Sequence, residues 1–153
     1  MDPWEYLCFK VYRLMSKIYI KKFIISKDDI DVNLHLRDST YVDYANKTKW
    51  AYFRENGILD EFKKEKIGPI VFEMNIQYKK EIFLNEEITI TLWFDYISED
   101  FRKWRLTSEI FNKDGDLSAV IKNFGSFIHL ERRKVVSAPI TVQATISKLL
   151  KNI

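Results

Sequence analysis

The segment from Asp31 to Tyr41 carries a carboxylate, an amide and an imidazole at alternate positions, Asp31, Asn33 and His35. Acyl transfer to water needs a base or nucleophile, and donors aimed at the carbonyl oxygen that becomes an oxyanion. Asp31 can provide the first, and free N–H groups at a helix start near residues 39–41 can provide the second. Because Asp31 precedes that helix by about nine residues, the loop between them must fold back.

The same residues also have plain structural explanations. Asp31 could cap a turn, and Asn33 could fix the loop through an Asx-type hydrogen bond. His35 could be a hydrogen-bonded structural histidine, and Tyr41 could pack into the core. His129, the second histidine, lies in a predicted strand and is interpreted as structural. The residue types alone leave both interpretations open.

A helix is predicted over residues 40–56, because tyrosine, alanine and threonine side chains recur there at spacings of three and four. Thr40 followed by Asp43 is typical of a capping-box-like start with an acidic residue in the first turn. Gly57 stands where a glycine commonly ends a helix. This helix is the element that must position the candidate site.

Period-two alternation predicts strands over residues 17–26, 70–78, 88–96, 102–113 and 117–131, and residues 141–151 are a candidate short helix. Phe72 is predicted to share a strand face with Met74 and Ile76, and Tyr96 is predicted to share one with Leu92 and Phe94. Short turns join the later strands, including an Asp-Gly turn at residues 112–115, and imply antiparallel pairing. The order predicts a two-layer α+β domain in which the helix covers one face of the sheet.

Composition fits one globular domain and argues against several function classes. The 153 residues are 46% hydrophobic, which is enough for a sizeable core. The 25 basic and 22 acidic residues give a net charge of +3, so the charge is mixed and no nucleic-acid partner is expected. No run of 18 apolar residues occurs, so no membrane span is expected. Cys8 is the single cysteine and two histidines are present; we therefore expect no disulfide, no metal site and no redox cofactor.

The N-terminal residues are a poor signal peptide, because an acidic residue comes first and no small-residue cleavage site follows. We interpret residues 1–16 as an extension, residues 17–139 as the domain, and residues 140–153 as a C-terminal tail. We expect a cytoplasmic protein.

From Asp31 to Tyr41 the sequence resembles the signature of the hotdog-fold thioesterases, which runs Asp-x-Asn-x-His, a polar stretch, and a Tyr ten positions after the Asp. Gly57 also stands where the family often has Gly. The segment IQYKKE at residues 76–81 looks like the family's strand ending in Tyr and basic residues. The resemblance covers roughly residues 18–139. It is strongest to short acyl-CoA thioesterases of the 4-hydroxybenzoyl-CoA type and to plant acyl-carrier-protein thioesterases.

The resemblance implies a single hotdog domain, an antiparallel sheet wrapped around a long central helix, that hydrolyses an acyl thioester, usually of coenzyme A. The catalytic residues that it implies are Asp31 as base or nucleophile, Asn33, His35 and Glu81; Ser39, Thr40 and Tyr41 would bind the substrate. From the residues alone, Glu81 is interpreted as a solvated charge at a strand end. One domain in the chain implies a homodimer or a dimer of dimers, a homotetramer, with sites at the interface.

Several positions depart from the family's pattern. Arg37 and Asp38 stand where Asn is very frequent, and Leu34 stands where Gly is common. Asn46 stands where some relatives carry a catalytic Glu on the helix. A dehydratase of this fold is disfavoured because no Pro follows His35. These departures support an alternative function, a non-catalytic hotdog protein that binds acyl thioesters or a protein partner.

Overall fold

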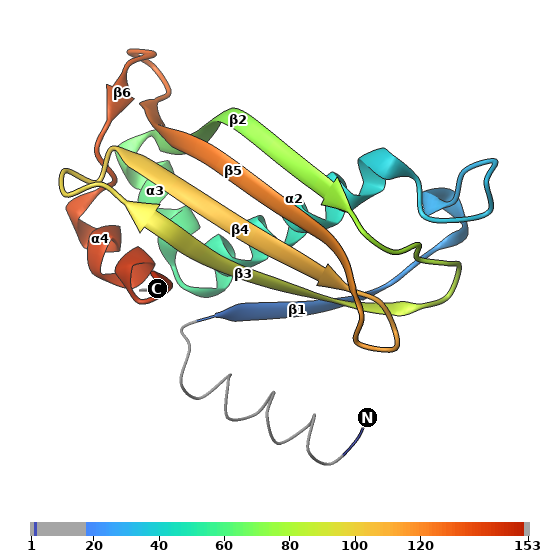
Figure 1. Ribbon diagram of the computed structural model, residues 1–153. Helices are drawn as coiled ribbons and strands as arrows, with labels where there is room; N and C mark the ends of the chain where they lie inside the picture. The colour runs from blue at the N-terminus through green and yellow to red at the C-terminus, as the bar shows by residue number, and fades with distance from the viewer. Residues whose placement is uncertain (1, 3–17, 152–153) are drawn as a thin grey trace.

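The computed structural model describes residues 2 and 18–151 (Figure 1). Its elements in chain order are β1 (Tyr19–Ile24), the 3-10 helix η1 (Lys27–Asp29), α2 (Asp38–Glu55), α3 (Ile58–Glu65), β2 (Ile67–Tyr78), β3 (Glu87–Ile97), β4 (Lys103–Phe111), β5 (Leu117–His129), β6 (Val135–Val136) and α4 (Ile140–Ser147). The predicted sequence of a strand, a long helix and four strands is confirmed. The extension predicted at residues 1–16 lies, apart from Asp2, outside the described residues.

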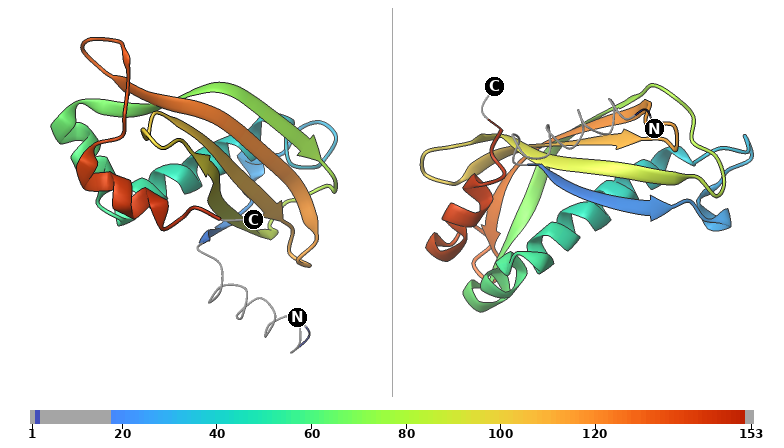
Figure 2. Two further views of the ribbon diagram at one scale, coloured as in Figure 1. Left: turned by 60° about the vertical axis from the view of Figure 1, so that its left-hand side comes forward. Right: turned by 90° about the horizontal axis from the view of Figure 1, so that it is seen from below.

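The strands form one antiparallel sheet in the order β1-β3-β4-β5-β2, with β6 added to β5. Figure 2 shows that the sheet curves and that helices α2, α3 and α4 lie on its concave side. Strands β1 and β2 are therefore the two edges. The predicted two-layer α+β architecture is confirmed, with the long helix held inside the curve of the sheet.

Helix α2 begins two residues earlier than predicted, with Arg37 as its N-cap residue and no side-chain cap. The capping-box start at Thr40 is wrong, because Thr40 lies inside the first turn and is buried. Gly57 adopts a left-handed φ of 72° just beyond the end of the helix, as the sequence predicts. The chain reverses there into α3, which the periodicity missed because this helix has eight residues and only two of them, Ile58 and Phe62, are buried.

Two strand bulges correct the predicted faces. A register shift between Val71 and Glu73 in β2 leaves Phe72 on the convex side, where its ring lies 6.0 Å from that of Phe124. A second shift precedes Tyr96 in β3, and the Tyr96 ring lies 5.7 Å from the exposed Arg105 guanidinium. The predictions that Phe72 shares a face with Met74, and that Tyr96 shares a face with Phe94, are therefore wrong. A bulge inverts the alternation of side chains beyond it, and only the pairing with a neighbouring strand discloses it.

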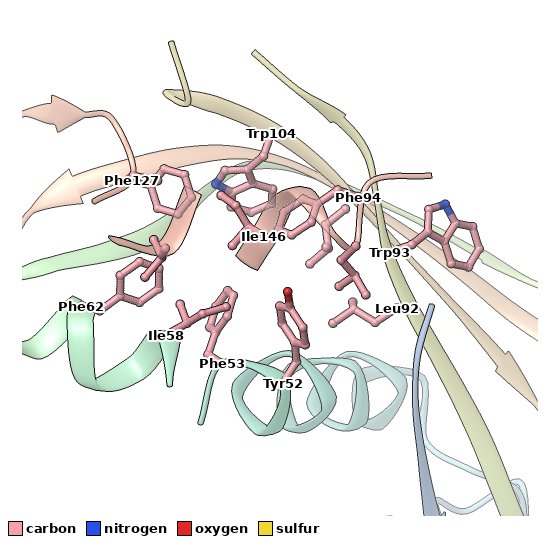
Figure 3. Close-up of a cluster of buried hydrophobic side chains, with 14 residues drawn as sticks. Tyr52, Phe53, Ile58, Phe62, Leu92, Trp93, Phe94, Trp104, Phe127 and Ile146 are labelled. Carbon is pink, nitrogen blue, oxygen red and sulfur yellow. The ribbon is translucent and has the colours of Figure 1, made fainter. Parts of the chain in front are cut away.

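Two buried clusters lie between the helices and the sheet. Figure 3 shows the first, in which Tyr52 and Phe53 of α2 point toward Phe94, Trp104 and Phe127 of the sheet. Its aromatic rings meet edge to face or tilted, the geometry that aromatic pairs prefer. The second cluster lies under the N-terminal half of α2 and has these members: Ile25, Leu36, Tyr41, Tyr44, Ala45, Ile82, Ile88, Ile90, Ile110, Ala119 and Ile121. Burial of each large side chain contributes about 1.5–3 kcal/mol. The second cluster thereby fixes the start of α2 against the loop before it.

Candidate active site

The loop before α2 contains a tight turn built around Asp31. The Asp31 N–H donates to the His35 carbonyl oxygen at 3.1 Å, and the Leu34 N–H donates to the Asp31 carbonyl oxygen at 3.0 Å. The Asp31 Oδ1 atom accepts the Asn33 N–H at 2.8 Å. Leu34 has a left-handed φ of 64°, a conformation that favours glycine, which accounts for glycine being common at this position in the family.

Three of the predicted site residues come together beside this turn. The His35 Nδ1 atom lies 3.0 Å from the Glu81 Oε1 atom, and His35 Nε2 lies 3.7 Å from the Asp31 Oδ2 atom. The Leu36 N–H donates to the Ile82 carbonyl oxygen at 2.7 Å and joins the loop to the segment after β2. An imidazole thus lies between two carboxylates, and we call Asp31, His35 and Glu81 the carboxylate–histidine cluster.

Asn33, another of the predicted site residues, is part of the turn. Its backbone N–H bonds to Asp31 and its side chain is exposed, so in this conformation it supports the turn and stays outside the cluster. The turn-capping explanation of Asp31 is also correct, because one carboxylate oxygen accepts this bond while the other faces His35. His129 caps a turn, since its Nδ1 atom accepts the N–H groups of Glu131 and Arg132.

The first turn of α2 is less open than the sequence suggested. The Ser39 N–H donates to Asp38 Oδ1 at 2.8 Å, and the Thr40 N–H donates to the Arg37 carbonyl oxygen at 3.0 Å. Both groups must release these bonds before they can bind a substrate oxygen. The Thr40 Oγ1 atom is buried and has no hydrogen-bond partner among residues 18–151, so it faces the interior.

Tyr41 packs beside the site. Its ring meets the Tyr78 ring edge to face at 5.1 Å, and the Tyr78 hydroxyl donates to the Asp38 carbonyl oxygen at 2.9 Å. Burial raises the pKa of Tyr41 to about 12, so this phenol stays protonated at neutral pH. Tyr41 and Tyr78 together attach the end of β2 to the start of α2.

The unusual Arg37–Asp38 pair does not form a salt bridge. The Arg37 Nη1 atom donates to the Asp28 carbonyl oxygen at 3.1 Å and Nε donates to Ser39 Oγ at 3.2 Å, while Asp38 accepts the Ser39 N–H. Arg37 therefore links η1 to the first turn of α2. Arg37 and Asp38, which stand where the family usually has asparagines, therefore stabilise the conformation of the loop.

Exposed apolar side chains occur in both chain segments that contribute to the cluster, the turn at residues 31–35 and the loop after β2. Val32 and Leu34 are 95% and 76% exposed at the tip of the turn. Phe83 and Leu84 are also exposed. They belong to the loop after β2, which lies at the same end of the molecule as the loop before α2 (Figure 1). Exposed apolar groups around a polar centre are typical of a ligand or partner site. The sequence signal for this surface is the pair of successive apolar residues Phe83 and Leu84 between the predicted strands at residues 70–78 and 88–96.

Within residues 2 and 18–151, no three side chains of His, Cys, Asp or Glu are grouped so that they could hold a metal ion. No helix in that same range is both long and apolar enough to cross a bilayer.

Comparison with known protein families assigns the chain to one of them. The model of the thioesterase-like superfamily matches residues 25–146, which include the turn, the cluster and every strand after β1. The chain belongs to the thioesterase-like superfamily. For this thioesterase-like protein, membership supports thioester hydrolysis as the general class of activity. A search of the curated proteins found no match.

Solved structures resemble this thioesterase-like protein over most of its length. The protein SAV2348 from Staphylococcus aureus, solved with CoA, has 19% identity and a TM-score of 0.75 over 89% of this chain and 87% of that chain. The DHNA-CoA thioesterase from Staphylococcus aureus has 21% identity and a TM-score of 0.71, with 78% and 80% covered. An acyl-ACP thioesterase from Bacteroides thetaiotaomicron has 13% identity and a TM-score of 0.75, with 90% of this chain and 55% of that chain covered. These likenesses confirm the single hotdog domain.

Proposed function

We propose that this protein hydrolyses acyl thioesters of coenzyme A to a free acid and a thiol. The observation that carries the proposal is the carboxylate–histidine cluster at the start of α2, with separations of 3.0 and 3.7 Å. Membership of the thioesterase-like superfamily supports the reaction class. The CoA bound to SAV2348 supports coenzyme A as the thiol carrier, ahead of an acyl-carrier protein.

In the proposed reaction Asp31 is the base or the nucleophile. As base, its Oδ2 atom takes a proton from water while the water oxygen bonds to the thioester carbon. The carbonyl electron pair moves to oxygen, and its return breaks the carbon–sulfur bond and releases the thiol after protonation. Glu81 orients His35 through the 3.0 Å contact at Nδ1. The remaining nitrogen of His35 then faces Asp31, where it can hold or pass on that proton.

The proposal includes a second copy of the chain along β2. This edge strand has 12 residues, and within residues 18–151 only one side of it is paired, with β5. Val71 and Met74 are 38% and 40% exposed and lie on its concave side, opposite Gly125 and Asn123. The Asn123 Oδ1 atom is buried there without a partner among the described residues. An unpaired strand edge with exposed apolar groups favours pairing with another strand. A dimer of dimers stays a prediction, as do a cytoplasmic location and the absence of a metal or redox cofactor.

The test is release of free thiol from a panel of short, long and aromatic acyl-CoA thioesters. The Asp31→Asn variant is expected to lose turnover by about a hundredfold or more, because general base catalysis contributes about 10²–10⁴-fold. Asp28→Asn is the matched control: Asp28 lies in the same loop and bonds to Arg37 through its backbone oxygen. It should keep the turnover of the parent chain. Circular dichroism of all three proteins checks that they fold alike.

One observation favours the alternative function, a hotdog protein that binds acyl thioesters without hydrolysing them. The N–H groups of Ser39 and Thr40 are already bonded within the chain, which leaves fewer donors for an oxyanion. Binding of acyl-CoA without thiol release from any thioester, including acyl-carrier-protein thioesters, would support it. Turnover that survives in Asp31→Asn would instead show that Asp31 has another role.

A further inference from the structure

A groove of about 610 Å³ lies between strand β1 and the outer side of α2. Lys21 and Phe23 line it from the strand; Lys47, Trp50 and Arg54 line it from the helix. Because β1 and β2 are opposite edges of the sheet, a second copy that pairs along β2 leaves this groove open. The groove also lies apart from the carboxylate–histidine cluster, whose Glu81 follows β2.

The groove has an excess of positive charge. Three of its lining residues, Lys21, Lys47 and Arg54, are cations, and one, Asp43, is an anion. Lys21 is paired with Glu55 at 2.9 Å. Within residues 18–151, neither Lys47 nor Arg54 has a carboxylate oxygen within ion-pair distance; Lys47 lies over the Tyr44 ring at 4.8 Å. The groove therefore fits an anionic ligand, which would gain charge-assisted hydrogen bonds from both side chains.

An aromatic ring lies between the two cations. Lys47, Trp50 and Arg54 follow at spacings of three and four, so they share one face of α2, and Lys47 and Arg54 are separated by about 10 Å along the axis. Trp50 is 38% exposed, and an edge-to-face contact with Phe53 at 5.6 Å holds its ring. An indole offers a stacking surface to a nucleic-acid base, and flanking cations bind phosphates.

We propose that this groove binds a nucleoside diphosphate group, with the base stacked on Trp50 and the phosphates held by Lys47 and Arg54. Free nucleotides and the nucleotide end of coenzyme A both carry this chemistry. The inference does not depend on thioester hydrolysis, because it concerns binding at the other side of α2. A single strand of nucleic acid is disfavoured because the whole chain has mixed charge, with 25 basic and 22 acidic residues.

The test is isothermal titration of the full chain with ADP, CoA, adenosine and pyrophosphate. ADP is expected to bind more tightly than adenosine or pyrophosphate, since only ADP uses both the ring and the cations. Lys47→Ala with Arg54→Ala should weaken ADP binding at least about tenfold, the usual size of a lost charged hydrogen bond. Trp50→Leu should weaken ADP but not pyrophosphate. The control is Lys63→Ala with Lys64→Ala, which removes the same charge from the exposed side of α3. This variant should bind ADP with the affinity of the parent chain.

The outcomes distinguish a free nucleotide from the nucleotide end of coenzyme A as the ligand, and they can overturn the proposal. If CoA competes with ADP and the groove variants weaken both, the natural ligand includes the nucleotide end of coenzyme A. If the groove variants weaken ADP binding alone, the ligand is a free nucleotide. The proposal fails if ADP does not bind, if pyrophosphate binds as tightly as ADP, or if the α3 control weakens binding equally. It also fails if a short single-stranded DNA binds more tightly than ADP. Unchanged melting temperatures show that the variants fold.

Discussion

The two edge strands of the sheet differ in what covers them. Strand β1 is tied to α2: the Tyr19 hydroxyl donates to Glu55 at 2.6 Å, and Lys21 pairs with the same carboxylate at 2.9 Å. Strand β2 has Val71 and Met74 uncovered on its concave side. An edge joined to the helix by polar bonds keeps a charged groove beside it, whereas an edge left with apolar groups favours pairing with another chain. Four variants test this difference, beginning with the largest expected effect.

Gly125→Ala should separate β2 from the sheet. A Cβ atom at Gly125 would meet the Ile70 carbonyl oxygen at 2.1 Å and the Trp104 ring at 2.4 Å, so the backbone of β2 must move. We expect a loss of more than about 3 kcal/mol in the free energy of unfolding, measured with urea. Gly68→Ala is the control, because a Cβ atom there meets only Leu130 Cδ2, at an ordinary 3.5 Å. Equal stability of both variants would show that this close approach is absent.

Met74→Asp should break the pairing along β2, since a carboxylate enclosed between two apolar surfaces costs several kcal/mol. We expect a dissociation constant at least about a hundredfold higher, and a mass of one chain in light scattering where the parent has two. Gln77→Asp puts the same charge on the exposed opposite face of β2 and should remain dimeric. The proposed interface is wrong if the parent protein has the mass of one chain in light scattering. It is also wrong if the Met74→Asp and Gln77→Asp variants are equally dimeric.

Glu81→Gln tests whether the end of β2 contributes to the reaction. The amide keeps an oxygen near His35 Nδ1 but loses the charge, so His35 should be less well oriented. We expect kcat to fall roughly tenfold or more with KM little changed, measured by thiol release. Glu87→Gln, on a residue whose carboxylate pairs with Lys22 at 3.6 Å on the β1 side, should retain full activity. A fall in both variants would place the effect outside the cluster.

Tyr44→Phe should have the smallest effect, on the β1 side. Burial raises the pKa of Asp29, but hydrogen bonds from Tyr44 and Ser26 outweigh this and hold the pKa below its ordinary value of 3.8. A lowered carboxyl pKa stabilises the fold above the unfolded value, and this stability is lost as the pH falls through the folded value. The variant should lose about 1 kcal/mol at pH 7.

The loss should shrink below pH 4, which urea unfolding at pH 7 and pH 3 can measure. Tyr96→Phe, on an exposed ring of the convex face, should show no pH-dependent difference. A loss for Tyr44→Phe that is equal at both pH values would show that the hydroxyl contact with Asp29 is not its cause.

Much of the fold follows from local pattern. Alternation predicts the five main strands, and spacings of three and four predict α2, because each periodicity places apolar groups on one face. Helix α3 and strand β6 escape this reasoning: α3 buries only Ile58 and Phe62, and β6 has two residues. The sequence does not predict the bulges beside Phe72 and Tyr96, because a bulge is defined by the register of two paired strands.

The candidate site likewise has one part that the sequence predicts and another part that only the tertiary structure shows. The sequence by itself determined that a polar loop precedes a helix, because Asp and Asn at residues 28–38 favour turns locally and the periodicity after residue 40 is helical. Tertiary structure alone decided that Glu81, 46 residues after His35, lies 3.0 Å from its ring. It also decided that the N–H groups of Ser39 and Thr40 are bonded within the chain. Contacts within a few residues follow from backbone preference, whereas contacts across the chain depend on how the sheet closes around α2.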